Sequence, residues 1–182
     1  GWKRKRRCIM ADQIAFTEDR DQILPLWSRV FGDSKEDIDF FLDNCKHKSC
    51  LGYFSDGVLV SMLFLVECSY CNQNGAYLYA VCTDKAYRGR GCVSRLIEEA
   101  KNTDHVFLWL IPANDSLFDF YARFGFQKKL YSDRKYAEHI VFSQKKDILA
   151  YLYEGSEYEF PVGMIYSRRN FPSGGTGLFE LK

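Results

Sequence analysis

A chain of 182 residues and 21.2 kDa fits one compact domain, and 47% hydrophobic with 27% charged residues is globular rather than disordered or fibrous composition. The longest apolar stretch without a charge covers only residues 57–66, whereas a membrane-spanning helix needs about 18 or more. The composition therefore predicts a soluble protein with no membrane partner.

The net charge of +1 is unevenly distributed along the chain. Residues 1–9 hold five of the 25 basic side chains and no acid, which leaves 20 basic against 24 acidic residues in the rest. A body with a net charge of −4 has no overall basic face for phosphate backbones, so no nucleic-acid partner is expected. Residues 1–9 are interpreted as an extension or added segment before a natural start at Met10, with a polyanion-binding or localisation arm as the alternative. Residues 10–182 are expected to form a single domain.

The chain has seven cysteines, an odd number in a protein large enough to build a core without disulfides. This pattern favours reduced thiols and a cytoplasmic location. The cysteines Cys45, Cys50, Cys68 and Cys71 could in principle surround a zinc ion. Small buried side chains are the preferred interpretation, because the pairs lack the usual knuckle glycines.

The first part of the domain is predicted to form two helices and a hairpin. Apolar residues recur at helical spacing over 21–44, and Gly32-Asp33-Ser34 interrupts them, so two short helices are expected. A strand over 50–54, a tight turn at Ser55-Asp56-Gly57 and a longer strand over 58–67 follow.

The second part is predicted to begin with a central strand. Residues 72–75 predict a turn, and the charge-free segment 76–83 predicts a buried strand. An amphipathic helix over 93–101, an apolar strand over 106–111 and a helix that starts near Asn114 and stops at Gly125 are expected next. Strands are expected around 131–142 and 157–166, with a helix over 145–153 between them and a loose tail at 172–175.

A glycine- and arginine-rich segment separates the central strand from the amphipathic helix. It reads Arg88-Gly89-Arg90-Gly91-Cys92-Val93-Ser94. Loop amides and a helix N-terminus can point together at an anion, and glycine lets the backbone approach a phosphate. Arg88, Arg90 and Lys85 add charge that favours a di- or polyphosphate over a monocarboxylate. The structural alternative is a solvated glycine turn.

Two common phosphate-binding motifs do not fit this segment. A P-loop requires Gly-x4-Gly-Lys-Ser/Thr, which is absent, so nucleotide hydrolysis has no support. A dinucleotide-binding fingerprint would use Gly89, Gly91 and Ser94, but its glycines directly follow the first strand, and an acid ends its second strand. Here residues 84–88 intervene, and the second strand ends at Pro112.

Two blocks of sequence, residues 79–91 and 114–126, together point to a known family. The first is similar to the acyl-CoA-binding motif of the GNAT superfamily of N-acetyltransferases, Arg/Gln-x-x-Gly-x-Gly/Ala, in which Arg88 and Gly91 match and Val93 holds the last position. The second resembles the family's next conserved region, with its asparagine, its tyrosine and its helix-ending Gly-Phe. The two blocks lie within residues 76–131, under a third of the chain.

The resemblance implies an α+β fold with α/β/α layers, in which helices flank a mixed, mostly antiparallel sheet. Two central parallel strands, 77–83 and 106–111, would splay apart to hold the pantetheine arm of acetyl-CoA, the expected co-substrate; no metal is expected. The implied CoA contacts are the backbone of Val81, Cys82 and Thr83 for pantetheine and the thioester carbonyl, the amides of Arg88, Gly89, Arg90, Gly91, Cys92, Val93 and Ser94 for pyrophosphate, and Asn114 for the pantetheine region.

The resemblance also implies a general acid. Tyr121 would protonate the departing thiolate, although a core tyrosine on a helix face is the structural alternative. The attacking amine must lose a proton before or during attack, and the family often uses a carboxylate for this step. Glu67 is the first candidate, Tyr79 and solvent are alternatives, and a solvated strand-end charge is the structural interpretation of Glu67.

The expected function is acetyl transfer from acetyl-CoA to a primary amine of a small molecule or peptide, by direct attack in a ternary complex. The alternative is a non-catalytic module that binds CoA or another phosphorylated ligand. Acceptor choice is expected to depend on the helices near 21–44 and on the segments after residue 131. A homodimer is compatible with the resemblance, because late strands in this superfamily often pair between subunits.

Overall fold

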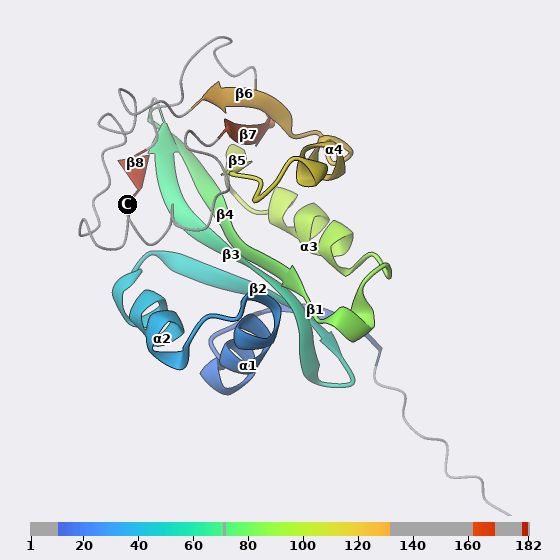
Figure 1. Cartoon of the computed structure of the whole chain (residues 1–182). Helices are drawn as coiled ribbons and strands as arrows, with labels where there is room; N and C mark the ends of the chain where they lie inside the picture. The colour runs from blue at the N-terminus through green and yellow to red at the C-terminus, as the bar shows by residue number, and fades with distance from the viewer. Residues whose placement is uncertain (1–10, 71, 132–161, 170–179, 182) are drawn as a thin grey trace, which may run out of the picture.

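The computed structural model describes residues 11–70, 72–131, 162–169 and 180–181 (Figure 1). The expectations for residues 1–9, 145–153 and 172–175 lie outside these ranges, as do nearly all of the strand expected around 131–142 and the start of the one expected around 157–166. The described strands are β1 (Gln13–Thr17), β2 (Lys48–Ser55), β3 (Val58–Tyr70), β4 (Gln73–Thr83), β5 (Phe107–Leu110), β6 (Gln127–Tyr131), β7 (Val162–Ser167) and β8 (Glu180–Leu181), and the helices are α1 (Arg20–Phe31), α2 (Lys35–Asn44), the short 3₁₀ helix η1 (Lys85–Tyr87), α3 (Cys92–Lys101) and α4 (Ser116–Ala122).

The described strands form one mixed sheet with helices on both faces. Its order is β1-β2-β3-β4-β5-β7-β6, and β8 pairs with the end of β3. All pairs are antiparallel except β4 with β5. Helices α1 and α2 cover one face, while α3 and α4 pack on the other (Figure 1). The predicted fold class is confirmed. No helix in the described ranges is long and apolar enough to cross a bilayer.

Local sequence signals account for the helices and the first hairpin. The Asp19 side chain caps α1 by accepting from the Asp21 N–H at 3.1 Å, and Ser34 caps α2 in the same way. Asp56 and Gly57 have φ of 49° and 78°, as a tight hairpin turn between β2 and β3 requires. The two helices and the hairpin were predicted; β1, β8 and the start of β6 at Gln127 were not.

The parallel strands β4 and β5 pair only at their beginning. The register aligns Gly75 with Phe107, Ala76 with Leu108, and Tyr77 with Trp109. Beyond this point β4 runs on to Thr83 without a described strand on that side. The predicted splay of the two parallel strands is therefore present.

Gly75 lies inside β4, and the turn predicted at 72–75 is wrong by about two residues. The left-handed residue is Asn72, with φ of 61°, and β4 already begins at Gln73. A Cβ on Gly75 would lie 2.2 Å from the Phe107 ring. The glycine thus marks a close approach between two strands rather than a turn.

Gly75→Ala is expected to lower the free energy of unfolding by about 1–3 kcal/mol, because the added methyl group would overlap the buried Phe107 ring and force it to shift. Urea denaturation measures this loss. Adding Phe107→Leu should recover part of it, since the smaller side chain makes space for the methyl group. A double variant as unstable as the sum of the two single variants would contradict this packing argument.

Candidate active site

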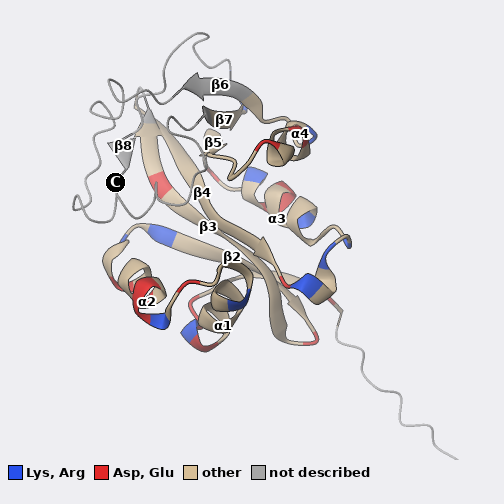
Figure 2. Cartoon of the chain, viewed as in Figure 1, with Lys and Arg blue, Asp and Glu red and all other residues tan. Residues whose placement is uncertain are grey.

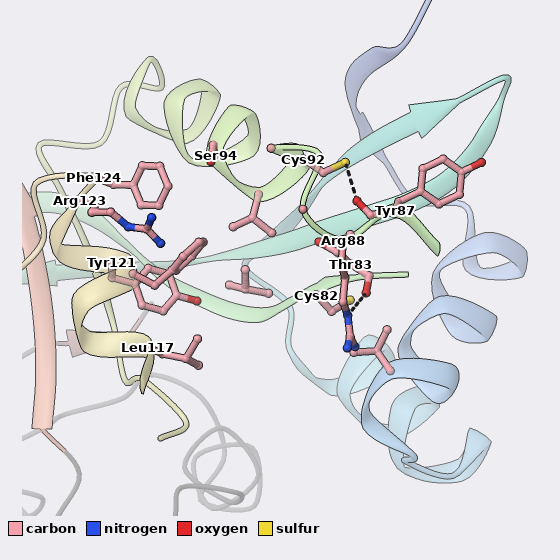
Figure 3. Close-up of a pocket in the computed structure, with 16 residues that line it drawn as sticks. Cys82, Thr83, Tyr87, Arg88, Cys92, Ser94, Leu117, Tyr121, Arg123 and Phe124 are labelled. Carbon is pink, nitrogen blue, oxygen red and sulfur yellow. Dashed lines mark hydrogen bonds between the residues drawn. The ribbon is translucent and has the colours of Figure 1, made fainter. Parts of the chain in front are cut away.

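A cavity of about 620 Å³ opens between α3, α4 and the second half of β4 (Figure 3). It is lined mostly by apolar side chains and by the loop that joins β4 to α3. The predicted site residues that line it are Val81, Cys82, Thr83, Arg88, Gly89, Gly91, Cys92, Val93, Ser94 and Tyr121. Strand, loop and helix thus bring both sequence blocks to one cavity.

The loop and the first turn of α3 can hold an anion through main-chain groups. Gly89 and Gly91 have φ of 76° and 77°, a region that other residues enter only at a cost. Gly91 caps α3 without a side chain, and the first helical hydrogen bond runs from the Arg95 N–H to the Gly91 carbonyl at 3.1 Å. The amides of residues 92–94 precede this bond, so they have no partner within the helix and suit a phosphate.

Basic residues occur along the loop between β4 and α3, where the ribbon is blue in Figure 2. Arg88 lines the cavity, and its Nε donates to the Thr83 carbonyl at 3.4 Å. Arg90 does not line the cavity; its guanidinium stacks on the Tyr87 ring with 4.9 Å between Cζ and the ring centroid. Of these two predicted cations, the structure therefore brings only Arg88 to the cavity wall.

Asp84 anchors the loop to both its own backbone and α1. Its carboxylate accepts from the Ala86 N–H at 3.1 Å and pairs with Arg29 of α1 at 2.8 Å. The Ala86 hydrogen bond first, and the two arginines Arg29 and Arg88 after it, lower the pKa of Asp84. The carboxylate thus stays charged and holds the loop between β4 and α3 in place.

A β-bulge distorts β4 where it passes the cavity. Met62 of β3 faces Cys82 and Phe64 faces Tyr79, so one residue of β3 opposes the pair Ala80 and Val81. Ala80 has φ of 51°, which strains a non-glycine residue. A bulge changes the direction of the local backbone. Beyond Tyr77, no described strand pairs with β4 on the side opposite β3. Peptide groups on that side are available to a ligand.

Tyr121 presents a protonated hydroxyl to the same cavity. The side chain is 6% exposed, and Figure 3 shows its oxygen directed into the cavity from α4. Edge contacts with the Phe120 and Phe126 rings, at 5.1 and 6.0 Å between centroids, hold the ring. Burial raises the pKa of Tyr121 well above its ordinary value of 10.0. The hydroxyl therefore stays protonated throughout the neutral range.

The structure does not bring Glu67 to this cavity. Glu67 pairs with Ala76 near the start of β4, and its Oε1 lies 2.8 Å from Nε2 of His105. Nδ1 of the same imidazole lies 2.7 Å from Oγ1 of Thr103. None of the described residues that line the cavity is a carboxylate or a histidine. The geometry accordingly gives no support to Glu67 as the base.

Two other predicted positions also lie apart from the cavity. Tyr79 packs between Trp27 and Phe41, with ring centroids 5.8 and 5.0 Å away, on the face covered by α1 and α2. Asn114 accepts a hydrogen bond at Oδ1 from the Ser116 hydroxyl at 2.6 Å, before α4 begins. Asn114 thus stabilises the approach to α4 in this structure.

Several residues line the cavity without having been predicted as site residues: Val30, Tyr87, Leu117, Phe120, Arg123 and Phe124. Leu117 and Phe124 share helical spacing with Tyr121, a pattern that also marks a face packed on a core. Val30 carries no signal in the sequence, because only the fold brings α1 to the cavity. Arg123 had one signal, a cation in an aromatic helical segment.

The described cysteines do not form a metal site. Cys45, Cys50 and Cys68 are free and buried, and no cluster of three metal-ligating side chains occurs in the described ranges; Cys71 lies outside them. Burial raises the pKa of Cys50 to about 12, so this thiol stays protonated and is a poor metal ligand.

Comparisons with known proteins identify the family and the fold of this chain. The family model described as an acetyltransferase (GNAT) domain matches residues 14–128. A GNAT family N-acetyltransferase from Escherichia coli in complex with CoA has a TM-score of 0.58 and 16% identity, covering 94% of this chain and 88% of that one. A GNAT family acetyltransferase from Elizabethkingia anophelis with acetyl-CoA bound has a TM-score of 0.57 and 13% identity, covering 86% and 97%.

One similar protein is much longer than this chain. A probable N-acyltransferase from Enterococcus faecalis has a TM-score of 0.55 and 17% identity; the match covers 66% of this chain and 33% of that one, so the chain spans about a third of that protein. No curated protein is similar enough in sequence to match. The family model covers more than half of the chain, and the solved structures share its fold. This chain therefore belongs to the GNAT acetyltransferase family.

Proposed function

We propose that this protein is an N-acetyltransferase that moves the acetyl group of acetyl-CoA to a primary amine within a ternary complex. The observation that carries the proposal is that the free amides of α3 and the Tyr121 hydroxyl open onto one cavity. The amides suit the pyrophosphate at one part of the cavity, and the hydroxyl suits a departing thiolate at another. The splayed β4 provides the backbone groups between them.

The proposed reaction uses these groups in sequence. Acetyl-CoA supplies the activated thioester, and the amine nitrogen attacks its carbonyl carbon. A backbone N–H of Val81–Thr83, beside the bulge, donates to the carbonyl oxygen as it gains charge. The C–S bond then breaks, and Tyr121 gives its proton to the thiolate. The amine nitrogen loses its extra proton to solvent, and the tyrosinate of Tyr121 takes up a proton from solvent, which restores the acid.

We propose a cytoplasmic setting for this reaction. The described cysteines Cys45, Cys50, Cys68, Cys82 and Cys92 are all free and buried, as in proteins of a reducing compartment. The proposed acceptor is an amine of a small molecule or peptide, and α1 reaches the cavity through Val30. The part of an acceptor site that borders the cavity can therefore come from the α1 side of the sheet.

The proposal predicts that Gly91→Ala weakens CoA binding by about 5- to 30-fold, because a left-handed backbone costs a non-glycine residue about 1–2 kcal/mol. Calorimetry with CoA measures the affinity. Thiol release and product mass, measured with acetyl-CoA and a panel of amines, report turnover. Gly57→Ala is the matched control: its φ is also positive and its Cβ would meet nothing, but it lies in the β2–β3 turn.

The two measurements separate the possible outcomes. CoA binding with no acetylated product across polyamines, amino acids, aminoglycosides and peptides would favour the non-catalytic binding module. Absence of CoA binding by the wild-type protein would overturn the proposal altogether. An equal loss in Gly57→Ala would show that the strain acts through stability rather than through the anion site.

A further inference from the structure

The cavity extends to the face of the sheet that α1 covers. Most of its apolar lining, such as Val81 and Leu117, packs with the core on the α3 and α4 face. Val30 lines the same cavity, but it packs with the core on the opposite, α1 face. The two faces meet where β4 has run past its described pairing with β5. A second substrate can therefore reach the cavity from the α1 face.

Aromatic rings of α1 and β4 lie next to this point. Trp27 comes one helical turn before Val30, and Tyr79 comes just before the bulge at Ala80. Their ring centroids are 5.8 Å apart. Phe31 follows Val30 directly, packs edge-on against Trp27 at 6.3 Å between centroids, and is 46% exposed. The end of α1 thus presents an exposed aromatic ring beside the cavity.

A carboxylate accompanies these rings. Asp33 lies in the turn after α1, and its Oδ2 accepts a hydrogen bond from the indole N–H of Trp27 at 2.7 Å. This hydrogen bond fixes the orientation of the Trp27 ring, which in turn supports Phe31, so the aromatic surface is formed before a ligand binds. Aromatic faces and a nearby carboxylate both attract an ammonium group. The surface suits an amine with an apolar body.

The exposed Phe31 ring has a specific consequence for the acceptor. Aromatic rings favour offset or edge-to-face contacts with one another, and burying exposed apolar area removes it from water. We infer that the acceptor is an arylalkylamine, whose ring packs on Phe31 while its amine reaches the thioester beside the bulge of β4. The products are the N-acetylated arylalkylamine and CoA. This inference rests on the proposed function and adds the substrate class.

A purely structural role of Phe31 makes a different prediction. Single exposed apolar side chains are common on protein surfaces, and Phe31 also covers part of Trp27. Loss of such a cover would lower stability and would affect all acceptors alike. A specificity role instead makes the effect depend on whether the amine carries a ring. A series of amines with and without a ring therefore separates the two roles.

The experiment compares kcat/KM for phenethylamine, putrescine and ethanolamine, at saturating acetyl-CoA, in the wild type and in Phe31→Ala. The wild type is expected to prefer phenethylamine. Phe31→Ala should lose about 5- to 30-fold with phenethylamine and less than about 2-fold with ethanolamine. Phe31→Leu should recover part of the loss, since it keeps apolar area. Phe16→Ala is the matched control, because Phe16 is 59% exposed on β1 and does not line the cavity.

The outcomes separate this inference from the proposed function. A wild type that prefers putrescine or ethanolamine, or an equal loss with all three amines in Phe31→Ala, overturns the inference alone. A loss in Phe16→Ala equal to that in Phe31→Ala also overturns it. Acetylation of a peptide, an amino acid or an aminoglycoside but of none of the three amines has the same meaning. No acetylated product from any amine overturns both proposals. Thermal unfolding verifies that each variant is folded.

Discussion

Tyr121→Phe is expected to lower kcat for acetyl transfer by about 10²- to 10⁴-fold and to leave the affinity for CoA nearly unchanged. The substitution removes only the hydroxyl that faces the cavity, while the ring keeps its contacts with Phe120 and Phe126. The thiolate must then leave without a proton from the protein. Initial rates of thiol release and calorimetry with CoA measure the two quantities.

A matched substitution controls for the loss of a tyrosine hydroxyl as such. Tyr166 of β7 packs on Phe126 but does not line the cavity, so Tyr166→Phe should leave kcat unchanged. If Tyr121→Phe keeps more than half of the wild-type kcat, Tyr121 is a wall residue and not the acid.

The raised pKa of Tyr121 sets the direction of its pH dependence. Because burial disfavours the tyrosinate, the hydroxyl remains protonated at and above pH 10, the ordinary pKa of tyrosine. Proton donation by Tyr121 is therefore expected to remain available as the pH rises from neutral toward 10, the range in which an amine increasingly becomes neutral. A wild-type rate that falls with a midpoint near pH 8 or 9 and loses this fall in Tyr121→Phe would contradict this assignment.

Local sequence was sufficient to predict the loop between β4 and α3. The loop at residues 88–94 combines glycines with a strand before it and an amphipathic helix after it, and these are neighbours in the chain. Gly89 and Gly91 adopt the positive φ that such a loop needs. The order of the two sequence blocks also placed Tyr121 correctly on the cavity wall, because α3, β5 and α4 follow one another directly.

Features that depend on register between distant segments were not predictable. Glu67 is a strand-end acid in the sequence, and only the β3–β4 register shows that it faces the start of β4 and His105. Gly75 belongs to an Asn-Gly pair that usually indicates a turn, yet the Phe107 ring, far along the chain, explains why it is glycine. The bulge at Ala80 has no sequence signature, since its cause is the pairing with β3.

Trp27→Ala is expected to lower the free energy of unfolding by about 3–5 kcal/mol, a large part of the roughly 5–15 kcal/mol of a typical domain. Trp27 is 1% exposed and joins α1 to the sheet, with its ring 5.5 Å from that of Phe64 and 5.8 Å from that of Tyr79. Its Nε1 also donates to Asp33 at 2.7 Å. Thermal unfolding should show Tm lowered by about 6–20 °C.

Two variants separate packing from other effects of this substitution. Trp27→Phe keeps an aromatic ring but loses the hydrogen bond to Asp33, so its loss should be smaller than that of Trp27→Ala. Phe16→Ala removes a ring that is 59% exposed on β1 and should change the unfolding free energy by less than about 0.5 kcal/mol. Equal losses in Trp27→Ala and Phe16→Ala would contradict the role of Trp27 as the core anchor of α1.

Trp27→Ala should also affect the binding of acetyl-CoA in the cavity. Val30 lies one helical turn beyond Trp27 on α1 and lines the cavity, and Arg29 next to it holds the loop through Asp84. If α1 packs loosely on β3 and β4, the positions of Val30 and of the Arg29–Asp84 pair become less well defined. We expect Trp27→Ala to raise KM for acetyl-CoA at temperatures where the protein is still folded. An unchanged KM would show that α1 stabilises the fold without shaping the site.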